Sequence, residues 1–182
     1  MNKKILFMRH AMTDYHKQKM IIGVTDIGLN KDGIAMIQNK MNSLIQYKIE
    51  VIITSDLIRA YQTGEIIAHY LKIPVYVEKG IYEGRQGVLE GMTFDDVYNK
   101  YGEINAFTKI EGRESIKVFM KRIDRAITQI CEKYENNVIL IVTHNNVLRT
   151  FFQMHGVRKE RWELCDIIEA NYHGEGRWKF DN

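Results

Sequence analysis

An arginine and a histidine stand side by side at Arg9 and His10, directly after the apolar stretch KILFM (residues 4–8). Neither side chain extends a buried strand, but both suit phosphate chemistry. A neutral imidazole can attack phosphorus and carry the phosphoryl group as a covalent intermediate. A guanidinium presents forked N–H donors that match phosphate oxygens. The pair alone is also compatible with an ordinary surface position, so the rest of the chain has to decide.

Two more apolar stretches end at polar residues of the same kind. The stretch EVIITS (50–55) ends at Ser55, with Arg59 one turn into the following helix, and NVILIVT (137–143) runs into His144. A cation in the first turn of a helix opposes the helix macrodipole, and a bound anion would remove that conflict. His144 is by itself equally compatible with a helix cap or a core position. The recurrence of such residues after three strands favours an anion site.

The apolar periodicity predicts an α/β fold in which short strands alternate with longer helices. We expect a three-layer α/β/α sandwich with a mostly parallel central sheet, formed by one domain over residues 1–182. Ligands of such sheets bind outside the carboxyl ends of the strands, where all three polar sets would meet. The expected strands are 4–8, 50–55, 74–78, 137–143 and 164–172, and the expected helices are 28–47, 56–71, 93–101, 114–134 and 145–155.

A leaving alkoxide needs a proton, so hydrolysis of a phosphate ester also requires a carboxylic acid near the histidine. The glycine-rich loop 79–92 offers Glu83 and Glu90. Arginines beside His10 would favour its neutral, nucleophilic form, because nearby positive charge lowers a histidine pKa. They would also stabilise the charge of the transferred group without a metal ion.

The composition is typical of a soluble globular protein, with 45% hydrophobic and 27% charged residues. A net charge of +3, interleaved with acidic residues, does not favour nucleic acid as a partner. Cys131 and Cys165 have no metal-ligand or redox spacing, and the N-terminal residues show no secretory pattern. No apolar run is long enough to cross a membrane. We therefore expect a cytoplasmic enzyme or binding domain.

Several segments, in the right order over residues 4–150, resemble the motifs of one family, the histidine phosphatase or phosphoglycerate mutase-like superfamily. Its R-H-G signature is similar to RHA at 9–11, followed by Thr13 at the usual Thr/Ser position. The segment GRES (112–115) resembles the family's G-G-E-S. The other matching segments are GVTDIGLNKDG (23–33), SDLIRAYQTG (55–64), EGRQGVLEG (83–91) and THNNVLR (143–149).

The resemblance implies a role for each matched residue. His10 would be the phosphorylated nucleophile, and Glu83 would protonate the leaving group and then activate water. Glu90 would belong to the hydrogen bonding of its own loop. The family needs no metal, and we expect no other cofactor. The phosphate pocket is expected to consist of Arg9, Arg59 and His144, with further substrate contacts from Thr13, His16 and Asn145.

Three of the departures from the family patterns lie at or beside expected site residues. Ala11 replaces a glycine whose carbonyl fixes the tautomer of the nucleophile; alanine keeps that carbonyl and is harmless where φ is negative. His16 stands where relatives often have a phosphate-contacting asparagine, and it either takes over that contact or faces solvent. Asn145 replaces another glycine and tolerates unusual backbone angles. None of these changes removes a catalytic group.

The leading hypothesis is metal-independent hydrolysis of a small phosphorylated metabolite, of the histidine acid phosphatase type. Phosphoglycerate mutase activity is the first alternative, but mutases of the family carry extra segments for which 182 residues leave little room. A weakly active module that binds phosphorylated ligands is the second, and the complete set of catalytic residues disfavours it. The substrate and the oligomeric state stay open. One or two of the residues Tyr98, Tyr101, Phe107 and Arg113 are expected to contact the leaving group.

Overall fold

Three parallel strands, β1 (Lys3–Arg9), β2 (Val51–Thr54) and β4 (Val138–Thr143), form the middle of a six-stranded sheet. The computed structural model describes residues 2–159 and 161–180. The strand order is β3-β2-β4-β1-β5-β6, with β3 parallel to β2 and β5 antiparallel to β1 and β6. The other elements are α1 (Asp14–Lys17), α2 (Lys31–Ile45), α3 (Ile58–Leu71), β3 (Val75–Val77), the 3-10 turns η1 (Lys79–Ile81) and η2 (Gly87–Leu89), α4 (Phe94–Tyr101), α5 (Ile116–Lys133), α6 (Asn145–Met154), β5 (Ile167–Tyr172) and β6 (Trp178–Phe180).

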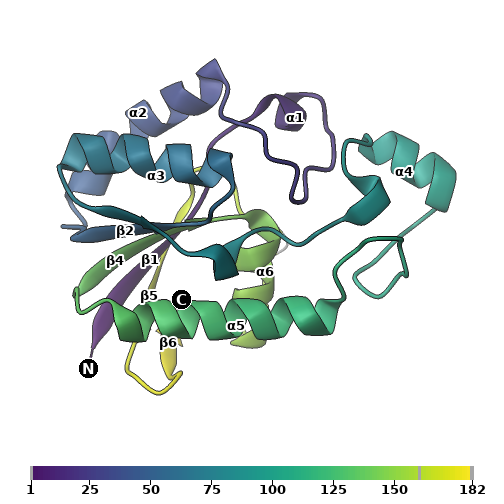
Figure 1. Cartoon of the computed structure of the whole chain (residues 1–182). Coiled ribbons are helices and arrows are strands. Elements are labelled where there is room, and N and C mark those ends of the chain that lie inside the picture. The colour runs from purple at the N-terminus through teal and green to yellow at the C-terminus, as the bar shows by residue number, and fades with distance from the viewer. Residues whose placement is uncertain (1, 160, 181–182) are drawn as a thin grey trace.

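Side chains of β1 alternate between the two faces of the sheet, and this alternation produces the three layers. Leu6 and Met8 pack with buried side chains of α2 and α3 on one face. Ile5 and Phe7 pack with those of α5 and α6 on the other face. Figure 1 shows α2 and α3 above the sheet and α5 below it. The predicted α/β/α sandwich with a mostly parallel sheet is confirmed.

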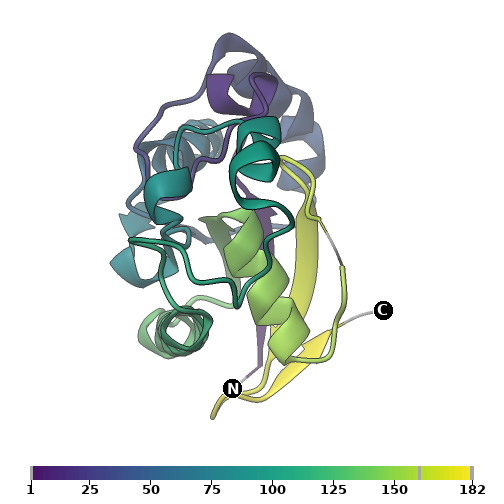
Figure 2. The same cartoon turned by 90° about the vertical axis from the view of Figure 1, so that its right-hand side faces the viewer.

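The carboxyl ends of β1, β2 and β4 meet at one edge of the sheet. Arg9 is paired with Thr143 at the last position of β4, and β2 ends beside the same part of β4. His10, Ser55 and His144 directly follow these three ends. The segments that carry α1 and α4 lie beyond this edge, at the right of Figure 1 and toward the viewer in Figure 2. The sheet therefore brings the three polar sets together, as predicted.

The boundaries of most elements agree with the prediction, and the differences involve short elements. α2 begins at Lys31, directly after its capping residue Asn30, and not at residue 28. β5 begins at Ile167 and not at residue 164. α1 and β6 were not predicted, because four and three residues are too few to show an apolar period. No helix in the described part of the chain is long and apolar enough to cross a membrane.

Gly33, in the first turn of α2, packs directly on the backbone of the segment that follows His10. A Cβ atom at this position would lie 2.2 Å from the carbonyl oxygen of Met12 and 2.9 Å from its nitrogen. The N–H of Gly33 also donates to the capping Oδ1 of Asn30 at 2.9 Å. The absence of a side chain at Gly33 therefore sets the distance between α2 and the chain that leaves the active-site edge.

We expect Gly33→Ala to lower the free energy of unfolding by about 1–3 kcal/mol, the usual cost of forcing extra atoms into a packed site. In an exposed helix the same change would stabilise the protein by about 1 kcal/mol. Urea unfolding can compare the variant with Asn39→Ala, a change at an exposed position of the same helix. A Gly33→Ala variant at least as stable as the wild type would contradict the close packing on Met12.

Candidate active site

His10 is buried at the carboxyl end of β1, and both of its ring nitrogens have partners. Its Nδ1 lies 2.8 Å from the carbonyl oxygen of Ala11 and therefore carries a proton, and its Nε2 accepts from the Nε–H of Arg59 at 3.2 Å. Burial, followed by Arg59 and the other nearby cations, holds the pKa of His10 well below its ordinary value of 6.5. Ala11 does not have a positive φ, so the loss of the family glycine causes no backbone strain.

Arg59 is fully buried in the first turn of α3. Its two terminal nitrogens donate to the carbonyl oxygens of Thr25 and Gly23 at 2.9 and 2.8 Å. The start of α3 is capped by a residue that is far away in the sequence: Asp26 Oδ1 accepts from the N–H of Ile58 at 2.7 Å. Burial lowers the pKa of Arg59, and Glu83 partly opposes this shift. The guanidinium is thus held by neutral carbonyls and keeps its charge available for an anion.

Arg9 supplies a second buried guanidinium on the same edge. Its Nη1 donates to the carbonyl oxygen of Trp162 at 2.7 Å, and its Nη2 donates to Nε2 of His16 at 3.0 Å. Its Nε is buried without a hydrogen-bond partner. Burial lowers the pKa of Arg9 to about 10, so the group stays charged at neutral pH.

His144 is fully buried beside His10, with 5.1 Å between the ring centroids. Its Nε2 lies 2.8 Å from Ser55 Oγ, which already accepts from the N–H of Leu57 at 3.2 Å. The Ser55 hydroxyl can therefore donate to Nε2, which leaves the proton of His144 on Nδ1. That Nδ1 is buried without a partner, and burial holds the pKa of His144 well below 6.5.

Two donors of this centre are thus buried without a hydrogen-bond partner among the described residues, namely Arg9 Nε and His144 Nδ1. Buried polar groups without a hydrogen bond are uncommon and costly, and each needs an explanation. Both belong to a group of side chains with net positive charge around His10. A tetrahedral oxyanion bound next to His10 is the ligand that this chemistry can accommodate.

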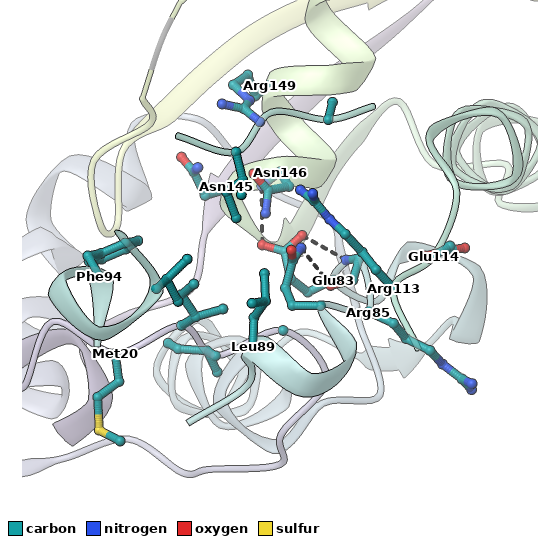
Figure 3. Close-up of a pocket in the computed structure, with 18 of the residues that line it drawn as sticks. Met20, Glu83, Arg85, Leu89, Phe94, Arg113, Glu114, Asn145, Asn146 and Arg149 are labelled. Carbon is teal, nitrogen blue, oxygen red and sulfur yellow. Dashed lines mark hydrogen bonds between the residues drawn. The ribbon is translucent and has the colours of Figure 1, made fainter. Parts of the chain in front are cut away.

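Of the two predicted carboxyl groups, Glu83 is the one that lines the pocket, and it is almost entirely buried. Its Oε1 accepts from the N–H of Gly84 at 2.9 Å, and its Oε2 accepts from the N–H of Asn146 at 3.2 Å (Figure 3). Burial raises the pKa of Glu83, while these hydrogen bonds and the arginines oppose the rise. A carboxyl group with a raised pKa can hold the proton that a leaving alkoxide needs.

His16 connects Arg9 to Thr13 and does not simply face solvent. Its Nδ1 lies 2.8 Å from the hydroxyl of Thr13, and its Nε2 accepts from Arg9. Burial and the charge of Arg9 lower the pKa of His16 to about 3. His16 lines the pocket described below, whereas Thr13 is fully buried behind it and does not. The structure therefore makes Thr13 a hydrogen-bond partner of His16 and not a residue of the pocket wall.

The other predicted residues lie where they can support the site. Asn145 lines the pocket, and its Oδ1 accepts from the N–H of Trp162 at 3.0 Å. Glu90 accepts from Gln86 N–H and from the hydroxyl of Thr25, both at 2.9 Å, and so belongs to the hydrogen bonding of its loop.

The sequence motifs did not reveal the backbone groups that hold these side chains. Gly84 and Asn146 orient Glu83 through their N–H groups, and Gly23 and Thr25 hold Arg59 through their carbonyls. Gly23 and Thr25 lie inside a matching motif, but a backbone carbonyl has no signature in residue type. In the sequence, the only signal for Gly23 and Thr25 was that both lie in the segment 23–33, which resembles a family motif.

Arg9, His10, Arg59 and Glu83 open into a pocket of about 970 Å³. Among the residues proposed to contact a leaving group, Tyr98 and Arg113 line this pocket, whereas Tyr101 and Phe107 do not. Within residues 2–159 and 161–180, no three or more His, Cys, Asp or Glu side chains cluster as a metal site. The remaining wall is partly apolar and includes Tyr15, Met20, Ile21, Leu89, Phe94 and Val97.

A neutral histidine among buried cations, at the carboxyl edge of a parallel sheet and close to a buried carboxyl group, has the features of a phosphoryl-transfer site. The family model of the histidine phosphatase superfamily (branch 1) matches residues 5–179. The chain belongs to this superfamily.

Similar proteins include several named phosphatases. The uncharacterized phosphatase PhoE of Bacillus subtilis is 29% identical over 140 residues, which cover 77% of this chain and 70% of that protein. Phosphoserine phosphatase 1 of Hydrogenobacter thermophilus is 25% identical over 156 residues, covering 82% of this chain and 74% of that protein. The structure of a mycobacterial glucosyl-3-phosphoglycerate phosphatase has a TM-score of 0.85 at 17% identity, covering 100% of this chain and 98% of that one. This last likeness concerns the fold.

The low pKa of His16 makes the stability of the fold depend on pH. Between about 3 and the ordinary value of 6.5, the unfolded chain binds a proton at this residue that the folded chain does not bind. The contribution of His16 to the free energy of unfolding is therefore fully present above pH 6.5, and it is lost as the pH falls toward 3.

We expect His16→Asn to reduce the slope of unfolding free energy against pH by up to about 1.4 kcal/mol per pH unit. The measurement is urea unfolding in phosphate-free buffers between about pH 7.5 and pH 5. His69→Asn, at an exposed position of α3, is the matched control and should leave the slope unchanged. An unchanged slope in His16→Asn would mean that His16 is protonated normally in the folded protein.

Proposed function

We propose that this protein is a metal-independent phosphomonoester hydrolase that acts through a phosphohistidine at His10. The observation that carries the proposal is the tautomer of His10: Nδ1–H donates to Ala11, so Nε2 is unprotonated and faces Arg59. The opposite pKa shifts of His10 and Glu83 support it, because the first favours a neutral nucleophile and the second favours a protonated acid in the same pocket.

In the first step, a phosphoryl group binds with its oxygens on the donors of Arg9, Arg59 and His144 Nδ1. Nε2 of His10 forms a bond to phosphorus while the bond from phosphorus to the ester oxygen breaks. The proton of Glu83 moves to that oxygen, so the leaving group departs as a neutral alcohol. The buried cations stabilise the negative charge of the transferred group.

In the second step, Glu83 is a carboxylate and takes a proton from water. The water oxygen forms a bond to phosphorus, the bond from phosphorus to Nε2 breaks, and inorganic phosphate leaves. His10 returns to its neutral tautomer because Ala11 still accepts from Nδ1–H. Glu83 regains its proton, and the cycle is balanced.

The named relatives support hydrolysis, since PhoE and phosphoserine phosphatase 1 are called phosphatases. We propose a small phosphorylated metabolite as the substrate, because the pocket of about 970 Å³ leaves room for a leaving group of that size beside the phosphate centre.

We expect His10→Ala to lower the hydrolysis of p-nitrophenyl phosphate at least about 10³-fold in the presence of a metal chelator. The loss follows because no other group in the centre can take the phosphoryl group from this position. Rapid quenching into alkali, followed by phosphorus NMR, should detect a phosphohistidine in the wild type. His69→Ala is the matched control, since this histidine is exposed on α3. Full activity of folded His10→Ala would overturn the mechanism.

We expect Glu83→Gln to slow the hydrolysis of alkyl phosphates by about 10²–10⁴-fold, the usual contribution of a general acid. Nitrophenyl phosphate should be affected less in a pre-steady-state burst, because nitrophenolate leaves without a proton. Glu90→Gln is the control from the same loop and should not change the dependence on the leaving group. Equal slowing of the burst for both ester types would show that Glu83 is not the acid.

A further inference from the structure

The carboxyl group of Glu83 takes its direction from the main chain around it. Both of its hydrogen bonds come from backbone N–H groups, those of Gly84 and Asn146. A general acid has to lie within hydrogen-bond reach of the oxygen that it protonates, and a displacement of about 1 Å can slow a reaction about 10²-fold. The contacts that fix the main chain before Glu83 therefore bear on the proposed chemistry.

Three consecutive carbonyl groups before the proposed acid accept hydrogen bonds from side chains of two other elements. Nη1 of Arg122, on α5, donates to the carbonyl oxygens of Gly80 and Tyr82, both at 2.9 Å. The hydroxyl of Thr143, at the end of β4, donates to the carbonyl oxygen of Ile81 at 2.7 Å. The main chain is thus held at every residue from Gly80 to Tyr82, directly before the acid.

Thr143 also joins this segment to the nucleophile. Its backbone carbonyl accepts from the N–H of His10 at 2.9 Å, while its hydroxyl donates to Ile81. Thr143 and Ile81 are fully buried, so water does not compete for the hydrogen bond between them. One residue therefore sets the distance between the main chain at His10 and the main chain that leads to Glu83.

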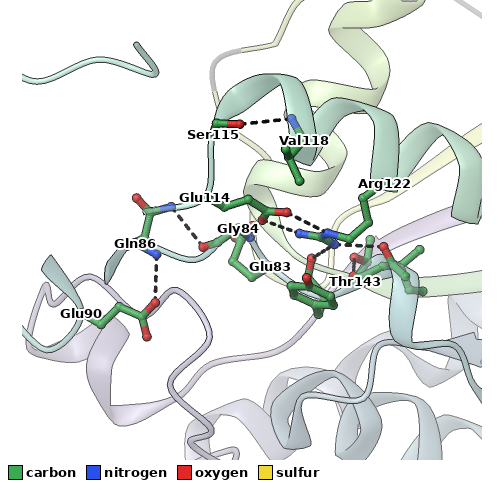
Figure 4. Close-up of polar contacts among 12 residues, drawn as sticks. Glu83, Gly84, Gln86, Glu90, Glu114, Ser115, Val118, Arg122 and Thr143 are labelled. Atoms are coloured by element: carbon green, nitrogen blue, oxygen red, sulfur yellow. Dashed lines mark hydrogen bonds and ion pairs between the residues drawn. The ribbon is translucent and has the colours of Figure 1, made fainter. Parts of the chain in front are cut away.

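The guanidinium of Arg122 is itself fixed on two further sides. Its Nε and Nη2 donate to the two carboxylate oxygens of Glu114 at 3.0 and 2.7 Å, and its Cζ lies 3.5 Å from the centre of the Tyr82 ring. Four of its five N–H donors are therefore used. Figure 4 shows this guanidinium between Glu114 and the segment that carries Glu83.

Arg122 does not act on the substrate directly. Glu114 lines the pocket, whereas Arg122 is not part of its wall. The carboxylate of Glu114 also neutralises the charge of Arg122. The hydrogen bonds to Gly80 and Tyr82 are thus the contacts through which Arg122 can influence the chemistry.

The same segment packs closely on α5 at two glycines. A Cβ at Gly80 would lie 2.4 Å from the Cβ of Ala126, and a Cβ at Gly84 would lie 3.3 Å from the ring of Phe119. Arg122 is three residues after Phe119 and four before Ala126, a spacing that puts all three on one face of the helix. This face of α5 therefore supports the main chain both before and after the acid.

We propose that Arg122 and Thr143 are positioning residues for the acid: by holding the three carbonyl groups of Gly80–Tyr82, they keep the carboxyl group of Glu83 within reach of the ester oxygen. This inference rests on the proposed hydrolase function and deepens it. Neither residue contacts the substrate or takes part in proton transfer.

The test compares phenyl phosphate with p-nitrophenyl phosphate, because phenoxide needs a proton from the acid whereas nitrophenolate leaves without one. kcat/KM reports the steps up to departure of this group. We expect Arg122→Gln to lower kcat/KM at least about tenfold for phenyl phosphate and less than about threefold for p-nitrophenyl phosphate. Thr143→Val, which keeps the shape of the side chain, should affect the two esters in the same unequal way. An equal loss for both esters, or no loss, would overturn the role of the residue concerned.

Two further variants on α5 separate the forked geometry of Arg122 from its charge. Arg122→Lys keeps the charge but lacks the planar fork that reaches a carboxylate and two carbonyls together, so it should lose nearly as much activity on phenyl phosphate as Arg122→Gln. Arg125→Gln, at an exposed position of the same helix, should leave both kcat/KM values unchanged. Full activity of Arg122→Lys would overturn the role of the hydrogen bonds to the carbonyls.

A double-mutant cycle with Glu83→Gln tests whether Arg122 acts through the acid. Glu83→Gln alone should slow the hydrolysis of phenyl phosphate, and adding Arg122→Gln should cause no further loss. Multiplication of the two losses would mean that Arg122 acts on another group, and it would reject the proposal for Arg122.

Crystal structures of the variants separate failure of this inference from failure of the proposed function. The carboxyl group of Glu83 should move by about 1 Å relative to His10 in Arg122→Gln and keep its place in Arg125→Gln. An unmoved Glu83, in a protein whose wild type hydrolyses both esters, would reject the positioning role alone. A displaced Glu83, in a protein whose wild type hydrolyses neither ester, would reject hydrolysis alone.

Discussion

The burial of Arg59 without a bonded carboxylate is the constraint on which the site depends. Its guanidinium is shielded from solvent and donates to two backbone carbonyls and to Nε2 of His10. Removing a cation from water is costly, and carbonyl dipoles offset only part of that cost. Burial is the main cause of the low pKa of His10, and the uncompensated charge of Arg59 lowers that pKa further and favours any anion that reaches it. The buried guanidinium of Arg59 therefore contributes both to the neutral form of His10 and to a site that favours anions.

The segment that supplies those carbonyls is hydrogen-bonded to the loop that carries Glu83, the proposed acid. The N–H of Ile21 donates to Met92 at 2.8 Å, and Gly91 donates back to Ile21 at 2.9 Å. Gly23 has a φ of 54° and packs so tightly on Glu90 that a Cβ would lie 2.3 Å from its carboxylate. Movement of the loop would thus disturb both Arg59 and Glu83. Among the described residues, Arg59 and Glu83 are thus coupled through the backbone, without a direct hydrogen bond between their side chains.

Most of the fold could be predicted because its strands and helices carry strong apolar patterns. β1 and β4 are almost continuously buried, and the long apolar stripe of α5 faces the sheet. The parallel alternation of these elements requires the ends of β1, β2 and β4 to share an edge. α1 and β6 were not predicted, because their few residues are stabilised by contacts with other segments, such as the pairing of β6 with β5.

The sequence by itself determined the chemical groups of the site: His10, Arg9, Arg59, His144 and Glu83 follow strands or lie in motifs long enough to be specific. Only the tertiary structure decided how those groups are used. The proton on His10 Nδ1 and the contact of Thr13 with His16 depend on hydrogen-bond geometry. Arg113 has no ion pair among the described residues, and the neighbouring carboxylate of Glu114 is held by Arg122. Residue types state which donors and acceptors exist, whereas packing decides which of them are satisfied within the protein and which are left for a ligand.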